Sequence, residues 1–115
     1  MSREIKFRAW IERNKEMITP YFFVNSENFI TQYGSSKPSQ VMQFTGLKDK
    51  NGVEIYEGDI LSHSKQGFCV VKYGSKHFDY AGFTLENQSG MTNTLQNPDI
   101  YEVIGSIHEN PELLS

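Results

Sequence analysis

The sequence has a single cysteine, Cys69, among its 115 residues, and it has no long apolar run. One thiol cannot form an internal disulfide, and a cysteine-based zinc site needs several. No segment reaches the roughly 18 consecutive apolar residues that a membrane-spanning helix needs. The N-terminal MSREIKFRAW is charged and carries no apolar leader. We therefore expect a soluble, cytoplasmic protein without a disulfide, a zinc site or a membrane segment.

Lysine and arginine are absent from the last third of the chain. Residues 77–115 hold six acids and neither Lys nor Arg, whereas residues 1–76 hold all eleven Lys and Arg against eight acids. The acidic part can pair with the basic part of the same chain, join subunits, or leave a basic patch for an anionic partner. We favour the first interpretation.

Length and composition fit one integrated domain, residues 1–115. The sequence contains eight Phe, six Tyr and one Trp, so we expect an aromatic core. Before the last residues no stretch keeps a helical period, and short apolar runs alternate with Gly-rich turns. This pattern predicts a mainly β protein built around a small barrel. We distinguish an N-terminal β part with a mobile loop, residues 1–44, from a small-barrel part, residues 45–115.

Apolar and polar residues alternate in EIKFRAW, residues 4–10, which predicts a strand with one buried face. This strand should form a hairpin with MITPYFFV, residues 17–24, in which Pro20 favours a sheet edge. Further strands are predicted at residues 41–47, 53–57, 60–64, 67–74, 78–85 and 100–104.

Two tight turns are expected in TGLKDKNGVEIYEGDIL, residues 45–61. Gly52 supplies the positive φ that the first turn needs. Asp49 and Asp59 stand at turn positions, where a carboxylate usually accepts hydrogen bonds from the backbone. These acids are therefore predicted to be structural.

The sequence also predicts an exposed loop and a short C-terminal helical turn. Residues 86–98, ENQSGMTNTLQNP, contain almost no bulky apolar residue, so we expect a long exposed loop there. Asn110, Pro111 and Glu112 form a helix start, with Asn as the cap and Pro at the first helical position. Only one short C-terminal helical turn has room to form, and Leu113 and Leu114 should dock on the barrel or on another subunit.

The histidines offer little support for a metal site. His63, His77 and His108 are dispersed, and the nearest approach to a motif is His77-x-Asp79, a spacing that is common by chance. We predict neither a metal nor a cofactor.

Nucleophiles and carboxylates give equally little support for catalysis. Cys69 lies in an apolar run, where a thiol usually acts as a small inert hydrophobe. A hydrolase that used the carboxylates around Glu57 would need a second positioned group, and no motif supplies it. We expect no enzyme activity.

The first predicted strand presents one candidate nucleic-acid surface. Lys6, Arg8 and Trp10 share its outward face, where cations and an aromatic ring can neutralise phosphates and stack bases. The acidic net charge argues against this use. The alternative that we favour is that Arg8 and Trp10 pack in a second, smaller core beneath residues 25–40. Arg3, Arg13 and Lys15 lie near the same strand in the sequence.

Three blocks, REIKFRAW, MQFTGLKDKNGVEIYEGDIL and EVIGSIHENPELL, resemble the YopX family of small phage and prophage proteins from low-GC Gram-positive bacteria. They cover about a third of the chain and occur in the family's order. The resemblance implies an N-terminal β-meander interleaved with an SH3-like small barrel, and it brings no catalytic residues. At Ile11 this sequence is apolar where the family tends to carry an acid.

These observations predict a phage or prophage accessory protein that acts by binding in the cytoplasm of a bacterial host. The expected partner is the protein itself, as a homo-oligomer, or a host or phage protein. A nucleic-acid-binding module that uses the basic N-terminal strand is the alternative. The candidate binding residues are Lys6, Arg8, Trp10, Tyr56 and Glu57.

Overall fold

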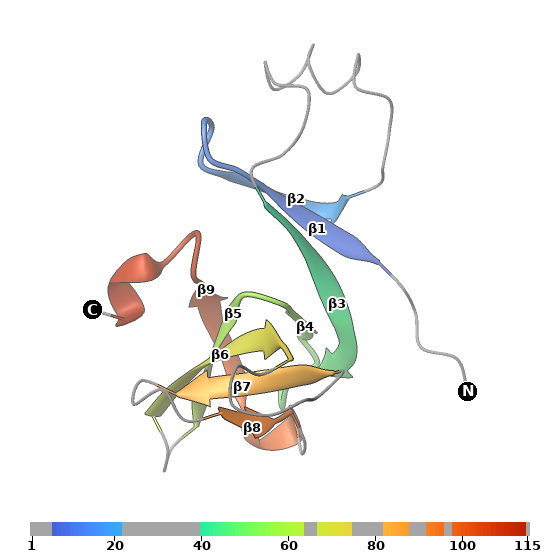
Figure 1. Cartoon of the computed structure of the whole chain (residues 1–115), viewed down its shortest axis with the longest axis vertical. Helices are drawn as coiled ribbons and strands as arrows, with labels where there is room; N and C mark the ends of the chain where they lie inside the picture. The colour runs from blue at the N-terminus through green and yellow to red at the C-terminus, as the bar shows by residue number, and fades with distance from the viewer. Residues whose placement is uncertain are drawn as a thin grey trace.

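The computed structural model describes residues 6–21, 40–63, 67–74, 82–87, 92–95 and 98–114. They form two antiparallel sheets, with strand orders β2-β1-β3-β4 and β8-β7-β6-β5-β9 (Figure 1). None of the described segments is a helix with the length and apolarity that crossing a bilayer requires. The elements are β1 (Phe7–Ile11), β2 (Glu16–Tyr21), β3 (Gln40–Lys48), β4 (Glu54–Tyr56), β5 (Asp59–His63), β6 (Gly67–Tyr73), β7 (Phe83–Asn87), β8 (Thr92–Thr94), η1 (Pro98–Ile100), β9 (Glu102–Ser106) and η2 (Pro111–Leu114).

Strand β3 connects the N-terminal hairpin to the curled sheet. Residues 40–43 pair with β1, whereas Phe44 and Lys48 pair with β4. Figure 1 shows β3 running from the β1-β2 hairpin down to the barrel strands. The predicted boundary between residues 44 and 45 falls inside this strand, so the two predicted parts share it. The predicted fold class, mainly β with a β-meander interleaved with a small barrel, is confirmed, and the barrel strands form a half-barrel.

Strand β1 is buried on both faces, which corrects the expectation of a single buried face. Ala9 and Ile11 are almost fully buried, and so are Arg8 and Trp10, which the alternation placed outward. The reason is that the face predicted to point outward packs against distant parts of the chain, where Arg8 pairs with Asp59 and Trp10 stacks on His108. Pro20 lies in β2, at the edge of this sheet as predicted.

The main core lies inside the half-barrel. Strand β6 contributes Cys69 and Val71 to it, and alternation along the strand leaves Phe68, Val70 and Lys72 on the opposite face. Burial raises the pKa of the Cys69 thiol, which suits an inert core residue. The buried cluster consists of Ile55, Leu61, Cys69, Val71, Phe83, Leu85 and Tyr101.

Within residues 86–98, the predicted long loop is wrong for 86–87 and 92–94, which form strands, whereas residues 88–91, 96 and 97 lie outside the described part of the chain. Strand β7 continues to Asn87, and β8 pairs with it in antiparallel register, Thr84 opposite Thr94 and Leu85 opposite Asn93. Strand β8 lies at the edge of its sheet. A strand at this position can consist of polar residues, because it does not need to bury apolar side chains. The alternation of apolar and polar residues, which predicted the other strands, therefore does not reveal β8.

Candidate functional site

The turn Glu57-Gly58, between β4 and β5, is the point where the two sheets meet. The Glu57 N–H donates to the Gln43 carbonyl of β3 at 2.9 Å, and the Gly58 N–H donates to the Val71 carbonyl of β6 at 2.8 Å. The Gly58 carbonyl accepts from the Ile107 N–H at 2.9 Å. Gly58 has a φ of 89°, in the left-handed region that favours glycine. This turn therefore fixes β3, β6 and the segment after β9 relative to one another.

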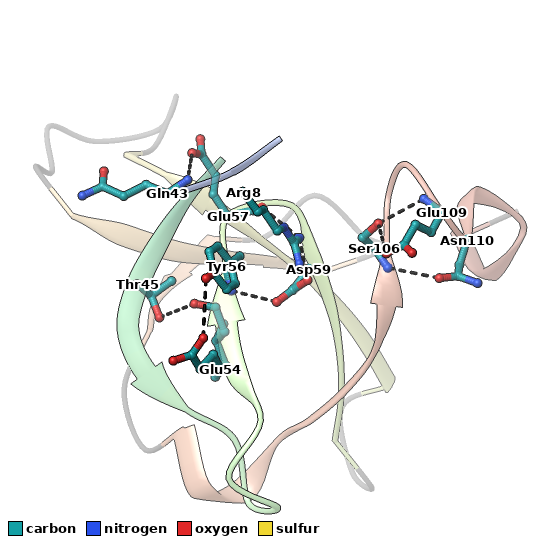
Figure 2. Close-up of polar contacts among 11 residues, drawn as sticks. Arg8, Gln43, Thr45, Glu54, Tyr56, Glu57, Asp59, Ser106, Glu109 and Asn110 are labelled. Carbon is teal, nitrogen blue, oxygen red and sulfur yellow. Dashed lines mark hydrogen bonds and ion pairs between the residues drawn. The ribbon is translucent and has the colours of Figure 1, made fainter. Parts of the chain in front are cut away.

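A buried ion pair lies directly beneath this turn (Figure 2). Arg8 Nη2 is 2.7 Å from Asp59 Oδ1, and the two side chains are 9% and 2% exposed. Burial raises the pKa of Asp59, and the Arg8 charge and the Tyr56 N–H, which donates to Asp59 Oδ2 at 2.7 Å, oppose that shift. The Arg8 guanidinium lies 4.8 Å from the centroid of the Tyr56 ring and donates to the Glu57 carbonyl at 3.3 Å. Arg8 therefore joins β1 to the β4-β5 junction.

Lys6 is also engaged within the fold. It forms an ion pair with Glu54, and its ammonium group lies 4.7 Å from the centroid of the Phe44 ring. Lys15 pairs with Glu12 in the β1-β2 turn. Arg3 lies outside the described residues. Lys6, Arg8 and Lys15 are therefore held by acids or rings of the same chain.

Trp10 lies in the interior, 3% exposed. Its ring stacks on the His108 ring at a centroid distance of 5.7 Å and an interplanar angle of 20°, and its Nε1–H donates to Glu12 Oε2 at 2.7 Å. A ring covered in this way has no free face on which a base could stack.

The structure thus brings four of the five predicted site residues together and separates the fifth. Lys6, Arg8, Tyr56 and Glu57 surround the β4-β5 junction, whereas Trp10 contacts the turn after β9. Arg8 and Trp10 are interior, as the favoured alternative predicts. Of the covering segment named there, residues 25–40, all but Gln40 lies outside the described residues.

Two adjoining hollows lie over the outer face of β6. The first has a volume of about 300 Å³ and the second about 290 Å³, and both include Val70, Lys72 and Ile107 in their walls. We call the pair the β6 groove. Besides these shared residues, the first hollow is lined by Gln40, Met42, Glu57, Gly58, Val71, Tyr73 and His108, and the second by Phe68, Glu86, Asn87 and Leu114.

The charged residues that line the β6 groove differ in whether another charge pairs with them. Lys72 Nζ is 3.2 Å from Glu86 Oε1, so these two charges offset each other. Burial, and then the nearby Arg8 charge, lower the pKa of His108, which keeps the imidazole neutral at neutral pH. The Glu57 carboxylate accepts one long hydrogen bond, 3.4 Å, from the Gln43 N–H. Glu57 is therefore the uncompensated charge among these lining residues.

The segment after β9 forms one wall of the β6 groove, and Asn110 holds it in place. The sequence predicts that Asn110 caps the last helical turn, but its Oδ1 instead accepts from the Ser106 N–H at 3.3 Å (Figure 2). The Asn110 N–H donates to the Ser106 carbonyl at 2.8 Å. The side chain thus closes the turn that precedes η2. A Cβ at Gly105 would lie 2.4 Å from Asn110 Oδ1, so this arrangement requires glycine there.

We expect Gly105→Ala to lower the free energy of unfolding by about 1–3 kcal/mol, because Asn110 must leave the Ser106 N–H to admit the methyl group. Urea unfolding of a double-mutant cycle measures this. In the Asn110→Ala background the same glycine change should cost clearly less. Equal costs in both backgrounds would contradict the proposed clash.

Sequence reasoning missed Asp59 as the partner of Arg8 and missed the β6 groove. The sequence predicts a turn role for Asp59, and its carboxylate does accept from the Tyr56 N–H. Its second role, as the partner of Arg8, has no local signal. A signal for the groove existed in GFCVVKY, where Phe68 and Val70 are apolar on the face of β6 that lies opposite the core residues. His77 and Asp79 lie outside the described residues. Within the described ranges no three His, Cys, Asp or Glu side chains are grouped to hold a metal ion.

Comparisons with known proteins show a similar crystal structure and a protein family that matches this chain. The crystal structure of protein EF1440 from Enterococcus faecalis is similar over 99% of this chain and 100% of that chain, with a TM-score of 0.64 and 29% sequence identity. Among curated proteins none matches this sequence significantly. The profile of the YopX protein family matches residues 21–115, which include β3, the β4-β5 junction and the whole β6 groove. This chain belongs to the YopX family.

Proposed function

We propose that this chain is a phage-type accessory protein that acts by binding a segment of another protein, and not by catalysis. The observation that carries the proposal is the β6 groove, two adjoining hollows of about 300 and 290 Å³ that share an apolar floor of Val70 and Ile107. Concave apolar sites with a few polar groups are the usual form of a binding site. Family membership supports the phage context, and the single cysteine supports a role in the reducing cytoplasm of a bacterial host.

Binding fits the lining of the groove better than catalysis does. Glu57 and His108 line the first hollow, but the residues that line it include no Ser, Thr or Cys that could act as a nucleophile. A peptide segment suits the site because the two hollows adjoin and would accept two side chains of one chain.

An array of short randomised peptides, probed with the labelled full-length protein, tests this function. We expect a subset of peptides to bind, and Leu114→Asp to weaken that binding at least about tenfold, because a carboxylate would replace one of the apolar side chains that line the second hollow. Leu113→Asp is the matched control: Leu113 is half-buried like Leu114 and does not line either hollow.

Three outcomes would change the proposal. If no peptide binds, or if Leu113→Asp and Leu114→Asp act alike, the β6 groove is not the site. If light scattering gives a dimer that Leu114→Asp converts to a monomer, the occupant is a second copy of this chain.

A further inference from the structure

We propose that the first hollow of the β6 groove accepts a lysine or arginine side chain, and that the second accepts an aliphatic side chain of the same partner segment. This inference rests on the proposed function, since it names the chemistry of the segment that the groove would bind.

The first observation is the state of the Glu57 carboxylate. None of the ion pairs described for this chain includes Glu57, and its one hydrogen bond, from the Gln43 N–H, is long at 3.4 Å. Figure 2 shows the side chain extending toward Gln43 and away from the Arg8–Asp59 pair. Since Asp59 already compensates Arg8, a cation from outside has Glu57 as its partner.

The second observation is the charge around Glu57. Lys72 is the one cation among the residues that line the first hollow, because His108 is neutral, and the Lys72 ammonium lies 3.2 Å from the Glu86 carboxylate. The formal charges of Glu57, Lys72 and Glu86 sum to −1, so the groove is electrostatically complementary to a single positive charge.

The third observation is the apolar floor. Met42, Val70 and Ile107 line the first hollow, and the methylene stem of lysine or arginine packs well on such a surface while its charged end reaches a carboxylate. Phe68, Val70, Ile107 and Leu114 supply the apolar side chains of the second hollow, and its two charged lining residues, Lys72 and Glu86, pair with each other. A neighbouring aliphatic side chain therefore fits there.

Nuclear magnetic resonance titration of the ¹⁵N-labelled full-length protein tests the inference. The probes are two blocked tripeptides, Arg-Ala-Leu and citrulline-Ala-Leu, which differ in charge and hardly in shape. We expect both to shift the amide signals of Gly58, Lys72 and Leu114, and the arginine peptide to bind roughly five-fold more tightly, the ratio that a partly exposed ion pair gives.

Variants separate charge recognition from a structural effect. Glu57→Gln keeps an acceptor for the Gln43 N–H and should abolish the preference for arginine, while Glu57→Lys should reverse it toward a glutamate-Ala-Leu peptide. Glu102→Gln removes one acid that lines neither hollow and should leave the preference unchanged.

The results distinguish failure of this inference from failure of the binding function. Equal affinity for the two tripeptides, or array peptides that bind the groove without a basic residue, would overturn the inference and leave groove binding standing. Absence of any peptide binding, on the array and in the titration, would overturn both.

Discussion

Arg8→Met should lower the free energy of unfolding by about 3–5 kcal/mol, the cost of leaving a buried charge without its partner. The substitution keeps most of the apolar stem but removes the guanidinium that lies 2.7 Å from Asp59, whose side chain is 2% exposed. It also removes the cation over the Tyr56 ring and the donor to the Glu57 carbonyl. Urea unfolding at neutral pH, read by fluorescence and circular dichroism, measures the loss.

A double variant shows whether the pair itself is responsible. Asp59→Asn keeps an acceptor for the Tyr56 N–H, and Arg8→Met with Asp59→Asn removes both charges. The double variant should be more stable than the sum of the two single losses implies, because no buried charge remains. A cost below about 1 kcal/mol for Arg8→Met would show that the pair is effectively solvated.

Asp49→Ala should cost at least about 3 kcal/mol, since it removes the acceptor of three backbone N–H groups. Asp49 Oδ1 accepts from Asn51 and Val53 at 2.8 and 2.9 Å, and Oδ2 accepts from Val103 of β9 at 2.8 Å. The carboxylate, 5% exposed, therefore ties the β3-β4 turn to a strand 54 residues away in the sequence. Lys50→Ala is the control, because its N–H bond to the Tyr101 carbonyl uses the backbone and survives the change.

The same residue gives a pH dependence with a definite sign. Burial alone would raise the pKa of Asp49, but the N–H groups of Val103, Val53 and Asn51 hold it below its ordinary value of 3.8. A carboxyl whose pKa is lowered in the folded state adds stability above its unfolded pKa, and this stability is lost as pH falls through the folded value. The stability advantage of the parent over Asp49→Asn should thus be full at neutral pH and shrink below about pH 4. A difference that stays constant from neutral pH into this range would contradict it.

The turns were the part of the fold that local sequence predicted best. Gly52 has the positive φ expected of it, at 83°, and Asp49 serves the backbone as predicted. Such features depend on the chemistry of a few adjacent residues, so they are visible before tertiary contacts are known. The hairpin of β1 and β2 was predictable for the same reason.

The candidate site was less predictable because it depends on contacts between distant residues. Arg8 and Trp10 have the alternation of an exposed face, and only the placement of Asp59 and His108 against them makes them interior. The β6 groove joins β3, β6 and the segment after β9, and no local pattern encodes that meeting. The sequence marks Glu57 as a candidate within residues 45–61, but its role as an uncompensated charge depends on the ion pairs of Lys72 and Arg8, which only the structure shows.

The charge asymmetry of the sequence finds part of its explanation within the chain. Lys50 pairs with Glu102 and Lys72 with Glu86, and each pair joins a cation from the first part of the sequence to an acid from the last third. Two acids of the last third thus lie against the chain's own cations, which agrees with the favoured interpretation for these two residues. The charged residues that line the β6 groove, Glu57, Lys72 and Glu86, carry a net charge of −1, so nucleic acid fits the groove poorly.

Hydrogen-exchange mass spectrometry with the tightest array peptide is the most direct test of binding through the β6 groove. We predict slower exchange in residues 67–73 and 107–114 when the peptide is bound, with residues 6–21 unchanged, and no such protection in Leu114→Asp. Protection confined to the β1-β2 hairpin, or the same pattern in Leu114→Asp, would contradict the assignment of this groove as the binding site.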